Sequence, residues 1–348
     1  MTASDLDVRY ARQARFPAIG TDGQRRLLGS RAAIVGVGAL GCAISNHLAR
    51  AGVGELILID RDIVDRTNLQ RQLLFDEADA FAGTPKAVAA AARLSAANSG
   101  ISIVARVAEL NAYNAETLLA GADVVLDGTD NFSARYLLNE YAVKTGTPWI
   151  YGGAVGSSGM SMTVVPGATP CLRCLFPEPP PGGALDTCET AGVLAPIVDT
   201  VASVQAMEAI KLLAGRPEAL HGTLLQIDLW HHQWQSLAIG DARAPGCPVC
   251  GERRFELLEG DAEEETMTST LCGRNTIQIS PGRPLSLDLN ALAPRLGKAG
   301  RAELSPYSLR LRLTGEITFL LFPDGRALVM GTEEAQTARR IYAELLGE

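Results

Sequence analysis

Residues 31–60, RAAIVGVGALGCAISNHLARAGVGELILID, decide the fold class of this chain of 348 residues. An apolar run over residues 32–37 leads into a glycine-rich turn, and a helix-like segment follows as far as Ala51. A second apolar run then ends at Asp60. The order of these segments predicts a strand, a tight turn, a helix and a second strand.

The turn is expected to bind a nucleotide. Gly36, Gly38 and Gly41 are spaced as Gly-x-Gly-x-x-Gly, with Ala39 after the second glycine. Glycine lets the backbone turn sharply and approach a phosphate closely, and the helix that follows directs its positive end at the ligand. Asp60, nineteen residues after Gly41, can accept a hydrogen bond from a ribose hydroxyl. This stretch alone suggests an NAD-dependent dehydrogenase, and a mononucleotide site is the alternative.

The composition is typical of a large globular protein. Hydrophobic residues make up 47% of the chain and charged residues 20%, which is ample apolar material for a core. A net charge of -8 argues against a protein that binds nucleic acid by covering its phosphates. The N-terminal segment is charged and lacks the apolar core of a signal peptide, and no run of about 18 uncharged apolar residues suggests a membrane span. We therefore expect a cytoplasmic protein that binds neither nucleic acid nor membrane.

The polar segment after the second strand contains residues that are expected to face a ligand. Asn68, Arg71 and Gln72 are spaced at i, i+3 and i+4, so in a helix they would share one face. Lys86 follows Gly-Thr-Pro at the start of an alanine-rich helix, where Pro85 fits the first turn. The ammonium group can reach a phosphate from that position, although a solvated helix start and a surface lysine are the alternatives.

Acidic residues follow another apolar run. Residues 122–127 predict a parallel strand that ends at Asp127, and Asp130 follows in the sequence Gly-Thr-Asp-Asn. Ligands of open α/β sheets collect at the carboxyl ends of the strands, so Asp130 is well placed to hold magnesium. Strands and helices alternate to about residue 150. This pattern predicts an α/β fold, with a doubly wound, mostly parallel, Rossmann-like sheet covered on both faces.

Four of the seven cysteines form two Cys-x-x-Cys pairs. The first pair is Cys171 and Cys174, and the second is Cys247 and Cys250. Each pair turns tightly enough to point both sulfurs at one ion, and a structural zinc site takes four such ligands. We expect a structural Zn²⁺, with a thioredoxin-like redox pair as the alternative.

Cys188 follows a segment rich in proline and glycine, residues 177–183, which is expected to be a loop. A long apolar helix is predicted shortly after this cysteine, over residues 196–213. The N-terminal dipole of that helix would favour a thiolate. We therefore expect a reactive cysteine, and an inert apolar residue is the alternative.

The pattern of the chain changes after Cys250. An acidic linker over residues 258–265 is expected to separate a domain at residues 1–257 from a smaller one at residues 266–348. Candidate strands and a closing helix follow the linker, at residues 276–279, 309–313, 317–322, 327–330 and 333–346. This pattern predicts a small α+β domain with antiparallel pairing, and the sequence does not identify its role.

Together these segments resemble the ubiquitin-activating-enzyme-like adenylyltransferases of the MoeB and ThiF type. The resemblance covers about residues 5–255 and rests on the motifs RYARQ, GVGALGC, LILIDRDIVDRTNLQRQ, TPK, LDGTDNF, CLRC, TCETAGVLAP and CPVC. It implies that ATP occupies the glycine turn. It further implies that the C-terminal glycine carboxylate of a ubiquitin-like sulfur carrier, similar to MoaD or ThiS, attacks the α-phosphate to give an acyl-adenylate and pyrophosphate.

The resemblance implies roles for individual residues of the nucleotide site. Asp60 would bind the ribose and Asp130 the Mg²⁺, while Asn131 would lie close to the adenine and Gln72 at the same site. The residues that would bind the phosphates are Asn68, Arg71 and Lys86. The family usually has a glycine where this chain has Ala39, so we expect a slightly altered fit of the nucleotide.

The resemblance also implies specific roles for Arg12 and Cys188. Arg12, in RYARQ, matches an arginine that crosses a dimer interface to the partner subunit's ATP, which implies a homodimer. Cys188 matches a cysteine proposed for a later thioester, persulfide or sulfur-handling step. A cysteine desulfurase or a sulfurtransferase is therefore a further expected partner.

The resemblance leaves the pathway open between molybdopterin, thiamine and thiolated-tRNA synthesis. A relative that adenylates a small carboxylate or a tRNA base is an alternative, and so is a binding module without catalytic activity. A dehydrogenase would leave Lys86 and the four paired cysteines without roles.

Overall fold

The computed structural model describes residues 3–179, 190–260, 267–271, 275–283, 285–313 and 315–347. The chain divides into two compact units, Met1–Gly260 and Asp261–Glu348. The first contains an eight-stranded sheet and the second a six-stranded sheet. Each unit has its own hydrophobic core.

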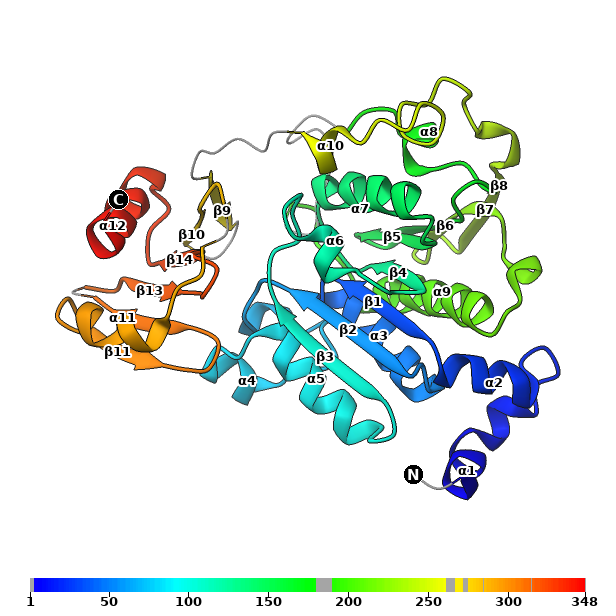
Figure 1. Ribbon diagram of the computed structural model, residues 1–348, viewed down its shortest axis with the longest axis horizontal. Helices are drawn as coiled ribbons and strands as arrows, with labels where there is room; N and C mark the ends of the chain where they lie inside the picture. Colours follow the sequence, from blue (N-terminus) through cyan, green and yellow to red (C-terminus); the bar gives the residue numbers. More distant parts are fainter. Residues whose placement is uncertain are drawn as a thin grey trace. The chain divides into compact units, whose positions relative to one another are not determined.

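The sheet of the first unit has the strand order β3-β2-β1-β4-β5-β6-β7-β8 (Figure 1). In chain order its strands are β1 (Arg31–Val35), β2 (Glu55–Asp60), β3 (Ser102–Val107), β4 (Val124–Asp127), β5 (Trp149–Val155), β6 (Ser158–Val164), β7 (Thr223–Asp228) and β8 (Gln233–Ala238). Strands β1 to β5 pair in parallel, and β6 to β8 extend the sheet with antiparallel pairs. The predicted mostly parallel sheet is confirmed.

Helices cover both faces of this sheet (Figure 1). The helices of the unit are α1 (Ala3–Ala14), α2 (Gly20–Leu28), α3 (Ala39–Ala51), η1 (Arg66–Asn68), α4 (Glu77–Ala82), α5 (Lys86–Ala97), α6 (Ala115–Leu118), α7 (Phe132–Thr145), α8 (Leu172–Leu175), α9 (Ala195–Leu213), η2 (Pro217–Ala219), η3 (Gly240–Ala242) and α10 (Glu256–Glu259). Ala32 and Ile34 of β1 belong to a core cluster with residues of α3, α5 and α9, whereas Ala33 and Val35 belong to a second cluster with residues of α7. Because both faces of β1 are buried, its sequence is a continuous apolar run rather than an alternation.

The chain passes from β1 to β2 and β3 on one side and then returns to β4 on the other side of β1. Loops at such a switch point form a crevice in which α/β proteins bind ligands. The loops after β1 and β4 lie very close together here. A Cβ atom added to Gly36 would lie 2.7 Å from the main chain of Gly128, and one added to Gly41 would lie 1.9 Å from the carbonyl oxygen of Gly36. Gly36 also has a φ of +82°, which other residues rarely adopt.

The second unit is an antiparallel sheet with two helices packed on one face. Its elements are β9 (Met267–Leu271), β10 (Thr276–Ser280), α11 (Leu289–Leu296), β11 (Arg301–Leu304), β12 (Leu309–Arg312), β13 (Thr318–Leu321), β14 (Ala327–Met330) and α12 (Ala335–Leu346), with the strand order β11-β12-β13-β14-β10-β9. Ile277, Phe319 and Val329 lie opposite one another on neighbouring strands and pack in one cluster with Leu296 of α11 and Tyr342 of α12. The four predicted strands and the closing helix are present, and the structure adds β9, β11 and α11.

The segment predicted as an acidic linker begins inside α10, and residues 261–265 lie outside the described part of the chain. The carboxylate of Glu140 fixes α10 to α7, because it accepts hydrogen bonds from the backbone N–H groups of Leu257 at 2.8 Å and Leu258 at 3.0 Å. Of the helices that the structure describes, none is long and apolar enough to cross a membrane.

The close approach of Gly41, at the start of α3, to the carbonyl oxygen of Gly36 generates a stability prediction. Gly41→Ala should destabilise the first unit by about 1–3 kcal/mol, because the new methyl group overlaps a carbonyl oxygen in a packed backbone. Thermal unfolding measures the change, with Gly240→Ala as the matched control, because a Cβ atom at Gly240 meets nothing within 4 Å. Equal melting temperatures for the two variants would contradict the proposed constraint.

Candidate functional site

The glycine turn is packed on one side and open on the other. The nearest atom to a Cβ added at Gly38 would be Nε2 of Gln72, 3.8 Å away. Gly38 is also the N-cap of α3, and no side chain caps this helix, so its positive end faces the open side. Ala39 is the first helical residue and has no positive φ, so its methyl group causes no backbone strain.

Asp60 joins the turn to the end of β2. Its Oδ2 atom accepts a hydrogen bond from the backbone N–H of Val37 at 2.6 Å, and its Oδ1 atom accepts one from the N–H of Asp62 at 2.7 Å. Burial raises the pKa of Asp60, and the nearby ammonium group of Lys86 opposes that rise. Each carboxylate oxygen keeps a second lone pair, so the arrangement is compatible with a further donor from a ligand.

The segment of Asn68, Arg71 and Gln72 forms a single 3-10 turn followed by a tight backbone turn, rather than a longer helix. The N–H groups of Arg71 and Gln72 both donate to the carbonyl oxygen of Asn68, at 3.1 and 2.9 Å. Asn68 and Gln72 are buried, and Arg71 is half-buried with Nη1 donating to the carbonyl oxygen of Thr67 at 3.1 Å. Oε1 of Gln72 is buried and has no hydrogen-bond partner, although its side chain borders the open side of the turn.

Lys86 begins α5 and is almost completely buried, as its side chain is 5% exposed. Its Nζ atom donates to Oδ2 of Asp62 at 2.9 Å, and its backbone N–H donates to the carbonyl oxygen of Asp62 at the same distance. Lys86 is therefore not a surface lysine. The sequence analysis did not identify Asp62 as a partner of Lys86. Its position two residues after Asp60, just past the end of the same strand, could have indicated that it lies close to the site.

Asp127 and Asp130 both follow β4, but they lie in different environments. Asp127 is completely buried and forms an ion pair with Nε of Arg135 at 2.9 Å. Arg135 also donates to the carbonyl oxygens of Thr129 at 2.9 Å and Gly152 at 3.1 Å, so it ties together the carboxyl ends of β4 and β5. No motif in the sequence analysis pointed to Arg135.

Asp130 is exposed, and so is Asn131, whose side-chain oxygen accepts a hydrogen bond from the N–H of Ala134 at 2.8 Å and caps α7. Arg61, which forms an ion pair with Glu109, lies near the same carboxyl ends. Burial would lower the pKa of Arg61, but carboxylates that include Glu109 and Asp130 outweigh burial and raise it. Asp130 therefore belongs to the same charged region as the loop after β2.

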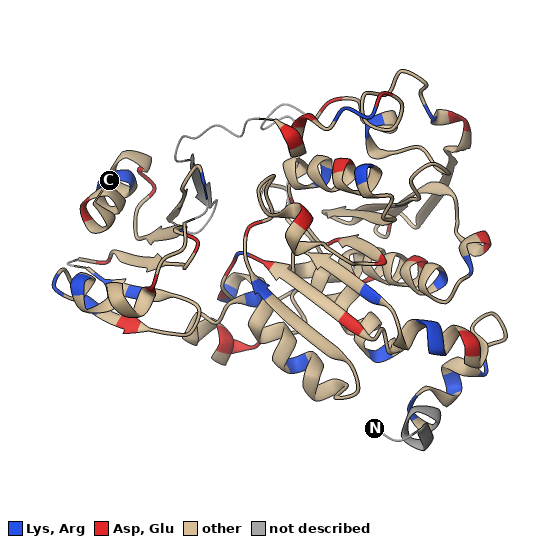
Figure 2. Cartoon of the chain, viewed as in Figure 1, with Lys and Arg blue, Asp and Glu red and all other residues tan. Residues whose placement is uncertain are grey.

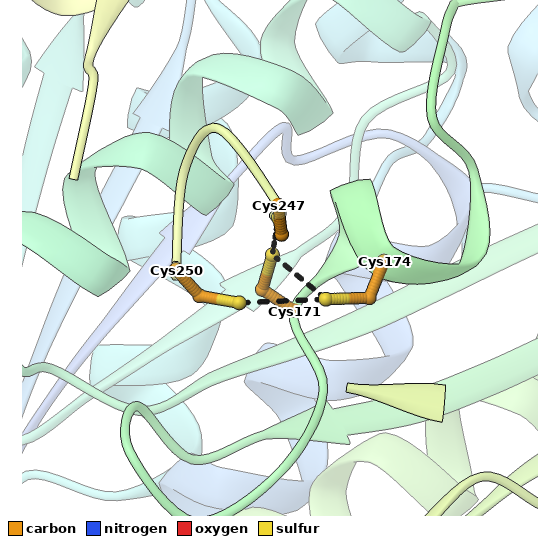
Figure 3. A group of neighbouring side chains, drawn as sticks. All are labelled: Cys171, Cys174, Cys247 and Cys250. Carbon is orange, nitrogen blue, oxygen red and sulfur yellow. Dashed lines mark hydrogen bonds between the residues drawn. The ribbon is translucent and has the colours of Figure 1, made fainter. Parts of the chain in front are cut away.

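The four paired cysteines meet at one point (Figure 3). The sulfur atoms are 3.9 Å apart between Cys171 and Cys174, 3.6 Å between Cys171 and Cys247, and 3.4 Å between Cys174 and Cys250. All four lie within 4.8 Å of one another, so the cluster could hold a metal ion. Burial raises the pKa of Cys250 to about 11, and because a metal binds the thiolate, metal binding at Cys250 would release a proton.

Asn139 of α7 lies beside this cluster and is completely buried. Its Oδ1 atom accepts a hydrogen bond from the N–H of Leu172, the residue after Cys171, at 2.8 Å. Burial raises the pKa of the Cys171 thiol, and a hydrogen bond with the side chain of Asn139 opposes that rise. Asn139 thus positions the first cysteine pair, a role that no spacing in the sequence could indicate.

Arg12 lies at the opposite end of α3 from the glycine turn. Helix α1 is fixed there by Gln13, whose Nε2 donates to the carbonyl oxygen of Ala51 at 2.9 Å. The rise from Ala39 to Ala51 along α3 is about 18 Å. Arg12 is exposed, and Figure 2 colours the basic residues of α1 and α2. The structure therefore does not bring Arg12 to the turn of its own chain.

Cys188 lies outside the described residues, and so does most of the segment rich in proline and glycine before it. The structure does bring Gln72 to the open side of the turn at Gly38, Asp60 to the backbone of the turn, and Lys86 to the neighbourhood of Asp60.

Comparisons with known proteins agree on one family. The model of the ThiF family matches residues 10–249. The sulfur carrier protein ThiS adenylyltransferase of Bacillus subtilis is 42% identical to this chain over 340 residues, which cover 97% of this chain and 99% of that protein. The SAMP-activating enzyme E1 of Haloferax volcanii is 42% identical over 259 residues, which cover 74% of this chain and 94% of that protein.

The solved structures include similar folds. The crystal structure of Escherichia coli MccB with ATP has a TM-score of 0.60 and 28% sequence identity, and the match covers 70% of this chain and 74% of that chain.

Proposed function

Because the chain belongs to the ThiF family, we propose that it uses ATP to adenylate the C-terminal glycine of a ubiquitin-like sulfur carrier protein. It is an adenylyltransferase, as its named relatives are. The observation that carries the proposal is the 42% identity over both units to an enzyme named for the carrier ThiS. The relative named for the carrier SAMP matches 74% of this chain. We therefore propose a ThiS-like carrier and a place in thiamine synthesis.

The reaction requires that a carboxylate oxygen of the carrier attacks the α-phosphorus of ATP, while the bond to the β-phosphate oxygen breaks and pyrophosphate leaves. The protein has little covalent chemistry to perform in this step. Fixed cations and exact placement of the two reactants therefore supply most of the rate acceleration.

We assign the nucleotide to the open side of the glycine turn. Asp60 would accept from the ribose, and Asn131 would lie near the adenine. The buried Oε1 atom of Gln72, which has no partner and borders Gly38, supports this assignment because such an atom is normally satisfied. The residues proposed to bind the phosphates are Asn68, Arg71 and Lys86.

We assign Mg²⁺ to Asp130. Its carboxylate is exposed at the carboxyl end of β4, in the charged region that also contains Arg61. A carboxylate is the kind of oxygen ligand that Mg²⁺ uses beside substrate phosphates. When bound, the ion would neutralise part of the triphosphate charge.

Asp130→Ala should lower carrier-dependent ATP–pyrophosphate exchange by about 100-fold or more, because it removes the metal carboxylate without removing core volume. The assay is run with a ThiS-like and a MoaD-like carrier in turn, and a wild-type protein that is inactive with both would reject the proposed function. Asp241→Ala, which removes another exposed aspartate, on η3, is the control and should retain activity. Full activity in a folded Asp130→Ala variant would remove Asp130 from the mechanism.

We propose that the metal held by the four cysteines is zinc in a structural role. A tetrahedron with Zn–S bonds of 2.3 Å has sulfur–sulfur edges of about 3.8 Å. The three measured separations, from 3.4 to 3.9 Å, fit that geometry. Four protein ligands leave no coordination position open for a substrate, so the ion would act by joining the two Cys-x-x-Cys segments.

Metal analysis of freshly purified, reduced protein should find about one zinc per chain. Chelation should lower the melting temperature before it lowers exchange activity, because the ion fastens two distant segments of the chain. Cys174→Ser should lose the metal, whereas Cys42→Ala, at a buried cysteine outside the cluster, should keep it. Equal zinc content in these two variants would contradict the assignment.

We propose a symmetric dimer in which Arg12 serves the nucleotide site of the partner subunit. The support is geometric, because α1 is anchored at the end of α3 that lies about 18 Å from its own glycine turn. The proposed dimer has a two-fold axis placed so that each α1 helix lies beside the nucleotide site of the other subunit.

Mixing Arg12→Ala chains with Asp130→Ala chains tests the shared site. Each variant should be inactive alone. In a mixed dimer, the site on the Arg12→Ala chain keeps its own Asp130 and receives Arg12 from its partner, so one whole site returns and activity should reappear on mixing. If subunit exchange is demonstrated by mass and no activity returns, Arg12 acts within its own chain and the proposal is wrong.

A further inference from the structure

Asp62 makes contacts that the proposed function leaves unused. We propose that Asp62 is a positioning residue, which holds the ammonium group of Lys86 in the one place where it can act on the phosphates of ATP. The inference rests on the proposed adenylation at the glycine turn.

Asp62 holds Lys86 at two points. Its carboxylate oxygen Oδ2 accepts from Nζ of Lys86 at 2.9 Å, and its carbonyl oxygen accepts from the backbone N–H of Lys86 at 2.9 Å. An antiparallel bridge between Ile63 and Pro85 fixes the same two segments to each other. These hydrogen bonds thus fix both the start of α5 and the side chain of Lys86 to the loop after β2.

That loop is in turn fixed to the glycine turn. The N–H of Asp62 donates to Oδ1 of Asp60 at 2.7 Å, and Oδ2 of Asp60 accepts from the N–H of Val37 at 2.6 Å. A continuous chain of hydrogen bonds therefore runs from the turn through two carboxylates to Lys86. These hydrogen bonds fix the position of the ammonium group of Lys86 relative to the glycine turn.

The charges around Lys86 identify Asp62 as its counter-ion. The side chain of Lys86 is 5% exposed, and a buried ammonium group without a partner is strongly disfavoured. The ionisable groups near it include Asp60, at the end of β2, and Cys42, on α3. Arg61 also lies 3.9 Å from the other oxygen of the Asp62 carboxylate, so this carboxylate faces two cations. Burial raises the pKa of Cys42 to about 12, so its thiol is neutral. The carboxylate of Asp62 is the group whose oxygen accepts a hydrogen bond from Nζ of Lys86, at 2.9 Å.

A fixed position for the ammonium group of Lys86 should increase the rate of the reaction. Lysine is a point charge on a flexible stem of four carbons, so its position must be fixed by a neighbour. Electrostatic acceleration depends on charges that are in place before the reaction begins. A neighbouring carboxylate also favours the protonated form of lysine, so Asp62 should extend activity toward high pH.

The test is Asp62→Asn, which keeps an acceptor oxygen and the shape of the side chain but removes the charge. Exchange rate should fall by about 10- to 100-fold, while the KM for ATP changes by less than about threefold, because the cation is misplaced rather than lost. The alkaline limb of the pH–rate profile should move to lower pH, because lysine without its counter-ion loses its proton more easily. A loss of folding alone would not move this limb, and thermal unfolding measures that loss separately.

Asp79→Asn is the matched control. Asp79 forms an ion pair of the same 2.9 Å length with Arg93, and its side chain is 17% exposed, against 22% for Asp62. This control should leave the pH profile unchanged. The inference is overturned if Asp62→Asn behaves as wild type, if it binds ATP more tightly without a loss of rate, or if Asp79→Asn shows the same shift. An inactive wild type would instead reject the proposed function, so the two failures can be told apart.

Discussion

The contact between the loops after β1 and β4 is the constraint on which the site depends. The strand order places these loops at the same edge of the sheet, and the absence of side chains at Gly36, Gly41 and Gly128 lets their backbones meet. Any Cβ atom at Gly41 would push the start of α3 away from the turn. The open side at Gly38, the uncapped end of α3 and the hydrogen bond from Val37 to Asp60 all lie within this tightly packed turn.

Charge at the same edge is arranged in pairs before any nucleotide arrives. Lys86 is paired with Asp62, Arg135 with Asp127, and Arg61 with Glu109. Pairing makes it possible to bury cations that would otherwise stay in water. The cations of these pairs differ in what else they contact. Arg135 also donates to two backbone carbonyl groups, whereas Lys86 is a cation that we assign to the phosphates.

The sequence predicted the parts of the molecule that follow local rules. Apolar runs located β1, β2 and β4, the glycine spacing located the turn, and paired spacing located the four cysteines. Arg135, Asp62 and Asn139 were missed because their partners are carboxylates and backbone groups that only the tertiary structure brings near. The i, i+3, i+4 pattern at Asn68 suggested a helical face, but the backbone closes a short 3-10 turn there. The strands β9 and β11 were missed because pairing with distant neighbours defines them more than their own composition does.

The most direct test of the account is the intact mass of the carrier protein after incubation with the enzyme and Mg²⁺-ATP. The account predicts that a ThiS-like carrier gains the mass of one adenylyl group, which is AMP less one water, that fragmentation places it on the C-terminal glycine, and that a carrier without that glycine gains nothing. An unmodified carrier, with the enzyme shown to be folded and to bind ATP, would contradict the account, and so would AMP attached at any other position.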